Sequence, residues 1–336
     1  MSVRNLSFPV LLAAAISYPM VAGDSRAKPT KPPVVENAAP VLWHDPTDIA
    51  TRDLFYGPGG HPHEPRGTFT FLKEDLGGTN PKFVVKDESG TKWKVKLGLE
   101  ARPETVASRI VWAAGYYANE DYFMPELHVQ GMPPRLHRGW KLVSPDGTVH
   151  NVRLKRESRE EKKIGNWRWR ENPFTNTREM NGLKVMMALI NNWDLKDENN
   201  AIYQEGSEQI YMVSDLGASF GTDGRSWPPE KGKGNLESYE KSVFVRHVSD
   251  NLVDFRVPAR PRWVFLVNPK EYFRRIGLEW IGHRVPRSDA RWMGEVLSHL
   301  SKNQIRDAFR AAGYSPAQVE GFSKILEDRI ITLTDL

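Results

Sequence analysis

The sequence of 336 residues contains no cysteine. This excludes thiol catalysis, zinc sites with cysteine ligands, disulfide bonds and a lipid anchor on an N-terminal cysteine. A strong excess of one charge is also missing, because 47 basic residues face 42 acidic residues. The net charge of +5 suits an anionic ligand but does not indicate nucleic acid as a partner. With 39% hydrophobic residues, the chain can bury an ordinary globular core.

Long apolar runs are absent except near the N-terminus. A basic start, an apolar run over residues 6–23 and small residues near its end are typical of a cleavable export signal. Pro9 and Pro19 interrupt the run, and no later segment has the roughly 20 apolar residues that a membrane span requires. We predict a signal peptide over residues 1–27, a proline-rich linker over 28–40, and an exported protein, periplasmic or extracellular, without a stable membrane span after cleavage.

Strand patterns dominate the region after the linker. Three runs of alternating apolar residues, over 68–73, 82–86 and 92–97, predict an antiparallel meander. A helix is expected to begin at Arg102, because Pro103 suits a first helical turn, and to end near Ala114. Longer extended segments are expected over 120–129 and 140–154, and the turn-rich segment 41–66 is expected to wrap over this part of the chain.

Helical patterns dominate the remainder. We expect a helix over 175–191, a short hairpin with strands at 201–203 and 210–213, and C-terminal helices over 289–300, 302–312 and 316–332. Between the two regions, residues 153–170 carry many charges of both signs with interleaved tryptophans, which favours a solvated helix face or a connecting loop over a nucleic-acid surface. The chain is therefore predicted to be α+β, with a sheet-rich lobe over 41–154 and a mainly helical lobe over 155–336.

Two acids and an amide follow the helix predicted to end at residue 191. Asp194 and Asn199 are five positions apart, and Asp215-Leu216-Gly217 comes after the predicted hairpin. The first spacing is that of the catalytic-loop pattern H-R-D-x-x-x-x-N, in which the aspartate accepts a proton from a substrate hydroxyl and the asparagine holds a magnesium ion. In this arrangement Asp215 occupies the place of a second metal ligand.

A phosphate-orienting lysine and its acidic partner can also be proposed. Lys96 ends the third strand pattern, and Glu104 opens the helix that follows it. Lys94 is the rival, because two residues earlier in a strand its side chain points the same way. The pair Gly77-Gly78 stands between the first two strands, where a glycine-rich phosphate loop belongs, although G-x-G-x-x-G is absent. Each feature alone is also compatible with a surface lysine, a helix start or an ordinary turn, but their order along the chain is informative.

These motifs resemble those of the protein-kinase-like superfamily. The run Asp194-Leu195-Lys196-Asp197-Glu198-Asn199 is close to the D-L-K-P-E-N of eukaryotic-type protein kinases, whereas the rest resembles atypical branches: bacterial toxin kinases, lipid kinases and secretory kinases. The chain departs from the common pattern, since Asn192-Trp193 replaces His-Arg, Leu216 replaces the phenylalanine of D-F-G, and no A-P-E follows.

The resemblance implies a two-lobed protein-kinase-like fold that uses ATP and Mg²⁺ to transfer the γ-phosphate to a hydroxyl acceptor, a protein or a small molecule. It also implies these roles: Asp194 as catalytic base, Lys196 at the transferred phosphate, Asn199 and Asp215 as metal ligands, and Gly77, Gly78, Lys96 and Glu104 at the nucleotide. Two alternatives remain open at this stage. The chain could be an exported pseudokinase-like binding protein without turnover, or a nucleotidyl transferase.

Overall fold

The computed structural model describes residues 38–78, 80–157, 162–221, 232–257 and 264–336. The predicted signal peptide and most of the predicted linker lie outside these residues, so export remains a prediction. The last linker residues form β1 (Ala39–Val41). In the described part of the chain, no helix combines the length and the apolar character needed to cross a membrane.

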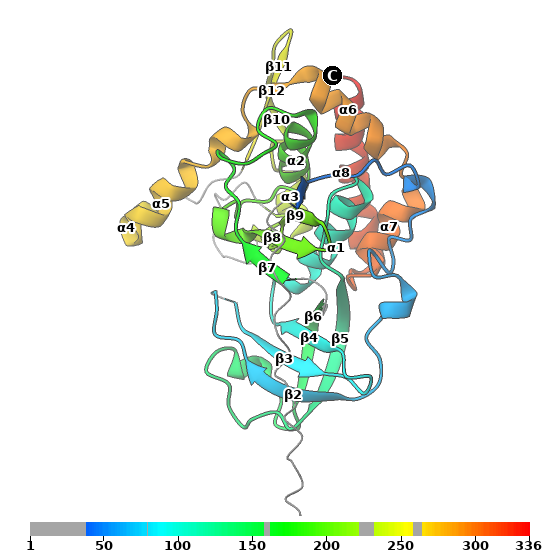
Figure 1. Ribbon diagram of the computed structural model, residues 1–336, viewed down its shortest axis with the longest axis vertical. Helices are drawn as coiled ribbons and strands as arrows, with labels where there is room; N and C mark the ends of the chain where they lie inside the picture. Colours follow the sequence, from blue (N-terminus) through cyan, green and yellow to red (C-terminus); the bar gives the residue numbers. More distant parts are fainter. Residues whose placement is uncertain (1–37, 79, 158–161, 222–231, 258–263) are drawn as a thin grey trace, which may run out of the picture. The chain divides into compact units, whose positions relative to one another are not determined.

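A closed five-stranded barrel makes up the sheet-rich N-terminal part (Figure 1). Its strand order is β2-β3-β4-β6-β5, with antiparallel pairing except between β2 and β5. The predicted meander is confirmed as its first three strands. The strands are β2 (Phe69–Glu74), β3 (Lys82–Lys86), β4 (Lys92–Lys96), β5 (Asp121–Gln130) and β6 (Thr148–Glu157).

The barrel closes over an apolar core made by alternate residues of its strands. Phe83, Trp93 and Leu154 are among its buried side chains, as the alternating pattern predicts. The extended segment predicted over 140–154 is a strand only from Thr148 onward. Residues Trp140–Leu142 form a 3₁₀ turn (η3) instead, because Gly139 precedes them with a φ of 70° and turns the chain.

Helix α1 (Ala101–Ala113) connects β4 to β5 in the chain, close to the predicted bounds. It is buried on nearly all sides, and even Arg109 is 1% exposed. The Arg109 guanidinium donates to the backbone oxygens of Phe55 and Asp121, at 3.1 and 2.8 Å, which satisfies this buried cation. Segment 41–66, which was predicted to wrap over the first lobe, thus packs on α1. Gln304 of the C-terminal part donates a hydrogen bond of 2.8 Å to the backbone oxygen of Ile49 in the same segment.

The remaining described chain is mainly helical, with two small sheets. One sheet has the order β1-β9-β8-β7 and the other β10-β11-β12. The strands are β7 (Lys162–Gly165), β8 (Asn200–Glu205), β9 (Glu208–Val213), β10 (Val245–Val248), β11 (Leu252–Phe255) and β12 (Val285–Pro286). The predicted hairpin is confirmed as β8 and β9, with longer strands than expected and a turn at Gly206.

The helices predicted in this part of the chain are confirmed as α2 (Arg178–Leu189), α6 (Arg287–Ser298), α7 (Lys302–Arg310) and α8 (Pro316–Thr334). The structure also has α3 (Leu236–Glu240), α4 (Val264–Val267) and α5 (Pro269–Ile276), which were not predicted. Short 3₁₀ turns are η1 (Ile49–Thr51), η2 (His61–His63), η4 (Asp197–Asn199) and η6 (Glu279–Gly282). Ser301 and Ser315 form capping boxes that fix the starts of α7 and α8.

The charged segment 153–170 was predicted to be a solvated helix face or a connecting loop, and the helix is wrong. Residues 153–157 and 162–165 lie in β6 and β7, and residues 166–170 form a loop. Trp167 and Trp169 are each 2% exposed, and their ring centroids lie 4.8 Å apart in the core that α1 and α2 share. Both tryptophans follow the end of β7 in a loop, where their side chains turn into the core and the intervening Arg168 is exposed.

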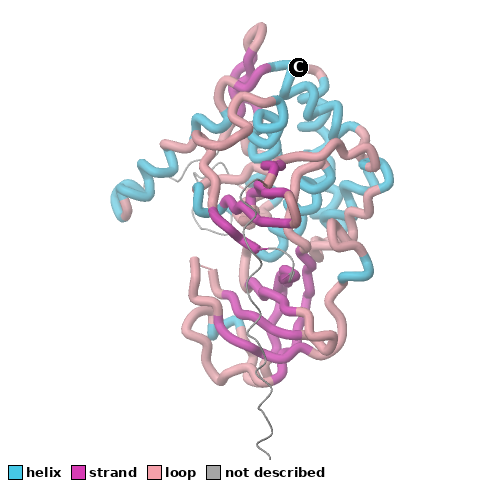
Figure 2. Tube along the Cα trace, in the orientation of Figure 1, coloured by secondary structure: helices cyan, strands magenta, loops and turns pink. Residues whose placement is uncertain are grey.

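Figure 2 shows strands throughout the barrel, and helices together with the two small sheets in the rest of the described chain. The predicted α+β class, with an antiparallel sheet first and a mainly helical part second, is confirmed.

Candidate active site

Lys96, the last residue of β4, lies at the centre of a cluster of acids. Its Nζ atom is 2.8 Å from Glu104, 3.0 Å from Glu100 and 3.2 Å from Asp215. Only 6% of its side chain is exposed. Burial by itself lowers the pKa of Lys96, but Glu104, Asp215 and Glu100 outweigh burial and raise that pKa above its ordinary value. The lysine is therefore a fixed positive charge at neutral pH.

Glu104, in the first turn of α1, is held between two cations from neighbouring strands. Its Oε2 atom contacts Lys96, and its Oε1 atom accepts a hydrogen bond of 2.7 Å from Arg153. Lys96 and Arg153 are cross-strand partners of β4 and β6, so both side chains project from the same face of the barrel. Arg153 also contacts Asp121 of β5, at 3.3 Å. The barrel thereby fixes the position of the Lys96–Glu104 pair.

Glu100 belongs to the same cluster, and we did not predict it from the sequence. One of its oxygens contacts Lys96, and the other contacts Lys233, at 2.5 Å. Burial raises the pKa of Glu100, but Lys96 and Lys233 outweigh it and hold that pKa below its ordinary value. The spacing of four residues between Lys96, Glu100 and Glu104 could have signalled this residue, because it places both glutamates near the end of β4.

Asp215 joins this cluster from the turn that follows β9. Its Oδ1 atom accepts a hydrogen bond from the Gly217 backbone at 3.2 Å as well as contacting Lys96. A Cβ atom on Gly217 would lie 2.7 Å from the Cβ of Glu100, a distance that real side chains do not adopt. The glycine of the Asp-Leu-Gly motif is therefore required by the packing of Glu100. About 37% of the Asp215 side chain remains exposed and accessible to a ligand.

The loop after α2 lies directly against the Asp215 turn. The backbone oxygen of Asn199 accepts hydrogen bonds from Ser214 and Asp215, at 2.8 and 3.3 Å. The Asn199 side-chain nitrogen donates to the backbone oxygen of Asp194 at 2.7 Å, which closes the loop on itself. Asn192, which stands where the common pattern has histidine, accepts a hydrogen bond of 2.9 Å from the Asp194 backbone. Asp194, the predicted base, and Asn199, a predicted metal ligand, thus belong to one hydrogen-bonded loop.

Two cations contact the carboxylate of Asp194. Lys196, predicted at the transferred phosphate, lies 3.4 Å from Asp194 Oδ1. Arg275 of α5 donates to the same oxygen atom. No local pattern indicates this second contact, since 81 residues separate Arg275 from Asp194.

The structure separates the two rival lysines. Lys94 lies 3.2 Å from Asp75 and 3.8 Å from Glu157, with 34% of its side chain exposed. Lys96 alone of the pair contacts Glu104 and Asp215. This geometry favours Lys96 for the nucleotide.

Gly77 and Gly78 lie in the turn between β2 and β3. Gly78 has a φ of 65°, and Arg138 donates to the backbone oxygens of both glycines. Asn80, later in the same turn, donates to Glu100 at 2.5 Å. The glycine turn is therefore tied to the acidic cluster through Asn80.

The oxygen donors of this site fit a hard divalent cation. Asp215 offers a partly exposed carboxylate. The side-chain nitrogen of Asn199 donates a hydrogen bond to the backbone oxygen of Asp194, so the side-chain oxygen of Asn199 is the atom that could bind a metal. Magnesium prefers oxygen donors of this kind. Single oxygens of Glu100, Glu104 and Asp215 also lie within 4.8 Å of one another, so the glutamates add further carboxylate oxygens nearby.

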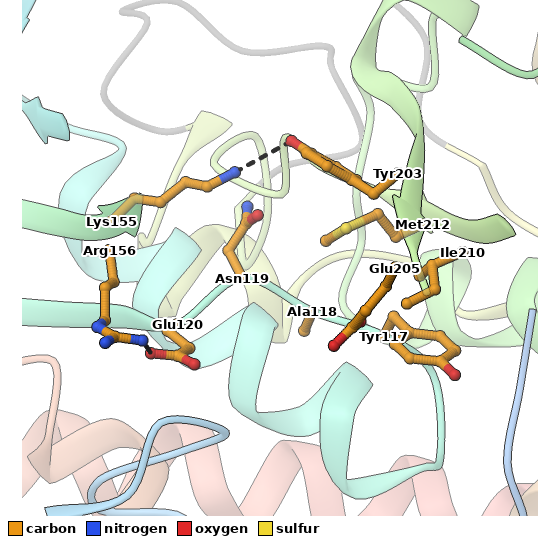
Figure 3. Close-up of a pocket in the computed structure, with 10 residues that line it drawn as sticks. All are labelled: Tyr117, Ala118, Asn119, Glu120, Lys155, Arg156, Tyr203, Glu205, Ile210 and Met212. Carbon is orange, nitrogen blue, oxygen red and sulfur yellow. Dashed lines mark hydrogen bonds and ion pairs between the residues drawn. The ribbon is translucent and has the colours of Figure 1, made fainter. Parts of the chain in front are cut away.

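Figure 3 shows a separate pocket beside this site. Lys155 and Tyr203 point toward one another across it, 3.3 Å apart, and Arg156 pairs with Glu120 at 3.5 Å. None of the predicted site residues is among its described lining residues. Asn119 in its wall donates to the Ser214 oxygen at 2.9 Å, so the pocket borders the Asp215 turn from outside the acidic cluster.

No protein-family model matches the chain, and no curated protein matches it by sequence. The solved structures that match include two kinases. The Helicobacter pylori proinflammatory kinase CtkA aligns with a TM-score of 0.45 and 11% identity, over 81% of this chain and 97% of that one. A Golgi casein kinase aligns with a TM-score of 0.33 and 10% identity, over 85% of this chain and 78% of that one. Because both TM-scores lie below 0.5, what the site can do is taken from its own residues.

Proposed function

We propose that the chain is an atypical kinase-like phosphotransferase that moves the γ-phosphate of ATP to a hydroxyl group of a protein or small molecule. The observation that supports this most directly is the contact of Lys96 with both Glu104 and Asp215. A strand, a helix and a loop far apart in the sequence supply these three residues. They are the residue types that orient a triphosphate and its metal in phosphoryl transfer.

In the proposed reaction, the Lys96 ammonium group binds the α- and β-phosphates, and Glu104 with Arg153 keeps that ammonium in place. The acceptor hydroxyl gives its proton to the Asp194 carboxylate as its oxygen attacks the γ-phosphorus. The bond from that phosphorus to the β–γ bridging oxygen breaks, and ADP leaves with the electron pair. Lys196, beside Asp194, would interact with the negative oxygens of the transferred group.

Asn199 and Asp215 would hold magnesium through an amide oxygen and a carboxylate oxygen. When bound, the ion neutralises charge on the triphosphate oxygens. The chain itself fixes these ligands through two hydrogen bonds. The Asn199 side chain donates to the backbone oxygen of Asp194, and the Asp215 backbone nitrogen donates to the backbone oxygen of Asn199.

A labelling experiment tests this function and separates it from its alternatives. We expect ATP with magnesium to raise the melting temperature, and label from [γ-³²P]ATP, but not from [α-³²P]ATP, to appear on an acceptor. Asp194→Asn should reduce transfer at least about 100-fold, the lower range for loss of a general base, without abolishing nucleotide binding. Asp215→Asn should weaken both phosphate transfer and nucleotide binding.

The other outcomes identify the alternatives. Transfer of the α-label would indicate a nucleotidyl transferase, and binding without any transfer would indicate a pseudokinase-like binding protein. Transfer of γ-label that survived both substitutions would contradict the assigned mechanism.

A further inference from the structure

Arg275 of α5 makes an unusually complete set of contacts for a residue outside the predicted site. Its Nη1 atom donates to Asp194 Oδ1 and, at 3.2 Å, to the Trp193 backbone oxygen. Its Nε atom donates to Glu271 at 2.6 Å, one turn earlier in the helix. Its guanidinium carbon lies 5.4 Å from the centroid of the Trp193 ring. Helix α5 therefore holds this arginine rigidly against the residue that carries the predicted base.

The burial pattern of α5 is inverted. Within this helix, whose residues are all described, Arg275 is the buried residue, and 2% of its side chain is exposed. The apolar neighbours Phe273 and Ile276 are 61% and 38% exposed. A buried cation costs free energy unless an anion and hydrogen-bond acceptors compensate for it. The packing of α5 thus places a guanidinium, rather than an apolar side chain, beside Asp194.

The two oxygens of Asp194 are used differently. Lys196 and Arg275 both contact Oδ1. Within the described residues, no hydrogen bond is donated to Oδ2, and 21% of the Asp194 side chain is exposed. Two cations on one oxygen fix the orientation of the carboxylate and leave the other oxygen for a hydroxyl group.

We infer that Arg275 is a positioning residue, which orients Asp194 so that Oδ2 accepts the proton of the acceptor hydroxyl. The inference rests on the proposed phosphotransfer. Arg275 itself neither gains nor loses a proton and does not contact the nucleotide in this role. Small errors in the position of a reacting group are costly, and a displacement of about 1 Å can reduce a rate about 100-fold. Removal of Arg275 should therefore lower kcat rather than substrate binding.

Steady-state kinetics of Arg275→Ala and Arg275→Lys test this role, with Lys270→Ala as the matched control. Lys270 is an exposed cation on the same helix. For Arg275→Ala we expect kcat to fall about 10- to 100-fold, KM for ATP and acceptor to stay within about 2-fold, and millimolar guanidinium chloride to restore part of kcat. Arg275→Lys should lose less activity, and Lys270→Ala should resemble the wild type. In an Asp194→Asn background, Arg275→Ala should change kcat less than about 2-fold, because the group it orients is already inactive.

Several results would overturn the inference. If kcat is unchanged or higher in Arg275→Ala, Arg275 does not position the base. If Arg275→Ala and Arg275→Lys both lose nucleotide binding and melt early, and guanidinium restores nothing, the role is structural only. Failure of the proposed function is visible without any variant. A wild type that binds ATP with magnesium but never transfers the γ-label would refute the phosphotransferase, and the role of Arg275 with it.

Discussion

Replacing Lys96 with methionine should destabilise the protein far more than the same change at Lys94. Lys96 neutralises Glu100 and Glu104, whose side chains are 7% and 1% exposed. Breaking a buried ion pair by removing one partner costs about 3–5 kcal/mol. Arg153 still contacts Glu104 and Lys233 still contacts Glu100 in the variant, so we expect the lower end, about 3 kcal/mol.

The two variants can be compared by urea unfolding and by thermal melting. With about 2.1 cal/mol/K of unfolding entropy per residue, about 300 folded residues shift by roughly 1.6 °C for each kcal/mol, so Lys96→Met should melt about 5 °C below the wild type. Lys94 makes only half-exposed ion pairs with Asp75 and Glu157, so Lys94→Met should cost no more than about 1 kcal/mol. Addition of ATP with magnesium should raise the melting temperature of Lys94→Met but not that of Lys96→Met.

The difference between wild type and Lys96→Met should also depend on pH. The pKa of Glu100 lies below its unfolded value of 4.5 in the folded protein, chiefly because Lys96 and Lys233 overcome the effect of burial. Its contribution to stability is then complete above pH 4.5 and is lost as the pH falls through the folded pKa. The part of the destabilisation by Lys96→Met that comes from Glu100 should therefore shrink below about pH 4.5. Burial raises the pKa of Glu104, so the part that comes from Glu104 should begin to shrink at a higher pH. Equal unfolding free energies for the two lysine variants at pH 7 would refute the assignment of Lys96 as the buried centre of the site.

Two further substitutions test the support of the site. Gly217→Ala should cost about 1–3 kcal/mol of stability and weaken ATP binding, because the new Cβ would lie 2.7 Å from the Cβ of Glu100. In the control Gly165→Ala the new Cβ meets nothing closer than 4.0 Å, so urea unfolding should show only a small loss of stability. Asp87→Asn should cost about 1–3 kcal/mol at pH 7, because Asp87 accepts hydrogen bonds from Trp93 Nε1 at 2.8 Å and from a backbone nitrogen at 3.0 Å. Burial raises the pKa of Asp87, but the hydrogen bonds that it accepts lower that pKa below 3.8. The loss of stability in Asp87→Asn should therefore diminish as the pH falls below 3.8. A loss of stability that does not depend on pH, measured by tryptophan fluorescence, would contradict this role of Asp87.

Local patterns predicted the elements that carry the acidic cluster. Strand β4 and helix α1 were foreseen because alternation and a helix-start proline are short-range signals. The interleaved tryptophans near residue 168 misled the prediction, because charges of both signs favour a solvated helix when burial is not known. In the structure, the loop after β7 carries Trp167 and Trp169 into the core that α1 and α2 share.

The contacts that complete the site are long-range, and no local pattern encodes them. Lys233 contacts Glu100 across 133 residues, and Arg275 contacts Asp194 across 81. Both cations would be read from the sequence as surface charges, because lysine and arginine are rarely buried. Their burial depends on the acids that the fold brings into contact with them. The sequence therefore shows that these residues are charged, but not which acids they contact.

The choice between Lys94 and Lys96 shows how topology decides a role that alternation leaves open. Both side chains point to one face of β4, so the strand pattern cannot separate them. Helix α1 begins at Ala101, so Glu100 at its N-cap and Glu104 in its first turn follow Lys96 by four and eight residues. Lys94 lies two residues further back, about 6.6 Å along the strand, and it pairs with Asp75 of the glycine turn instead. The short connection from β4 to α1 therefore selects the lysine, since it fixes which ammonium group lies within contact distance of Glu104.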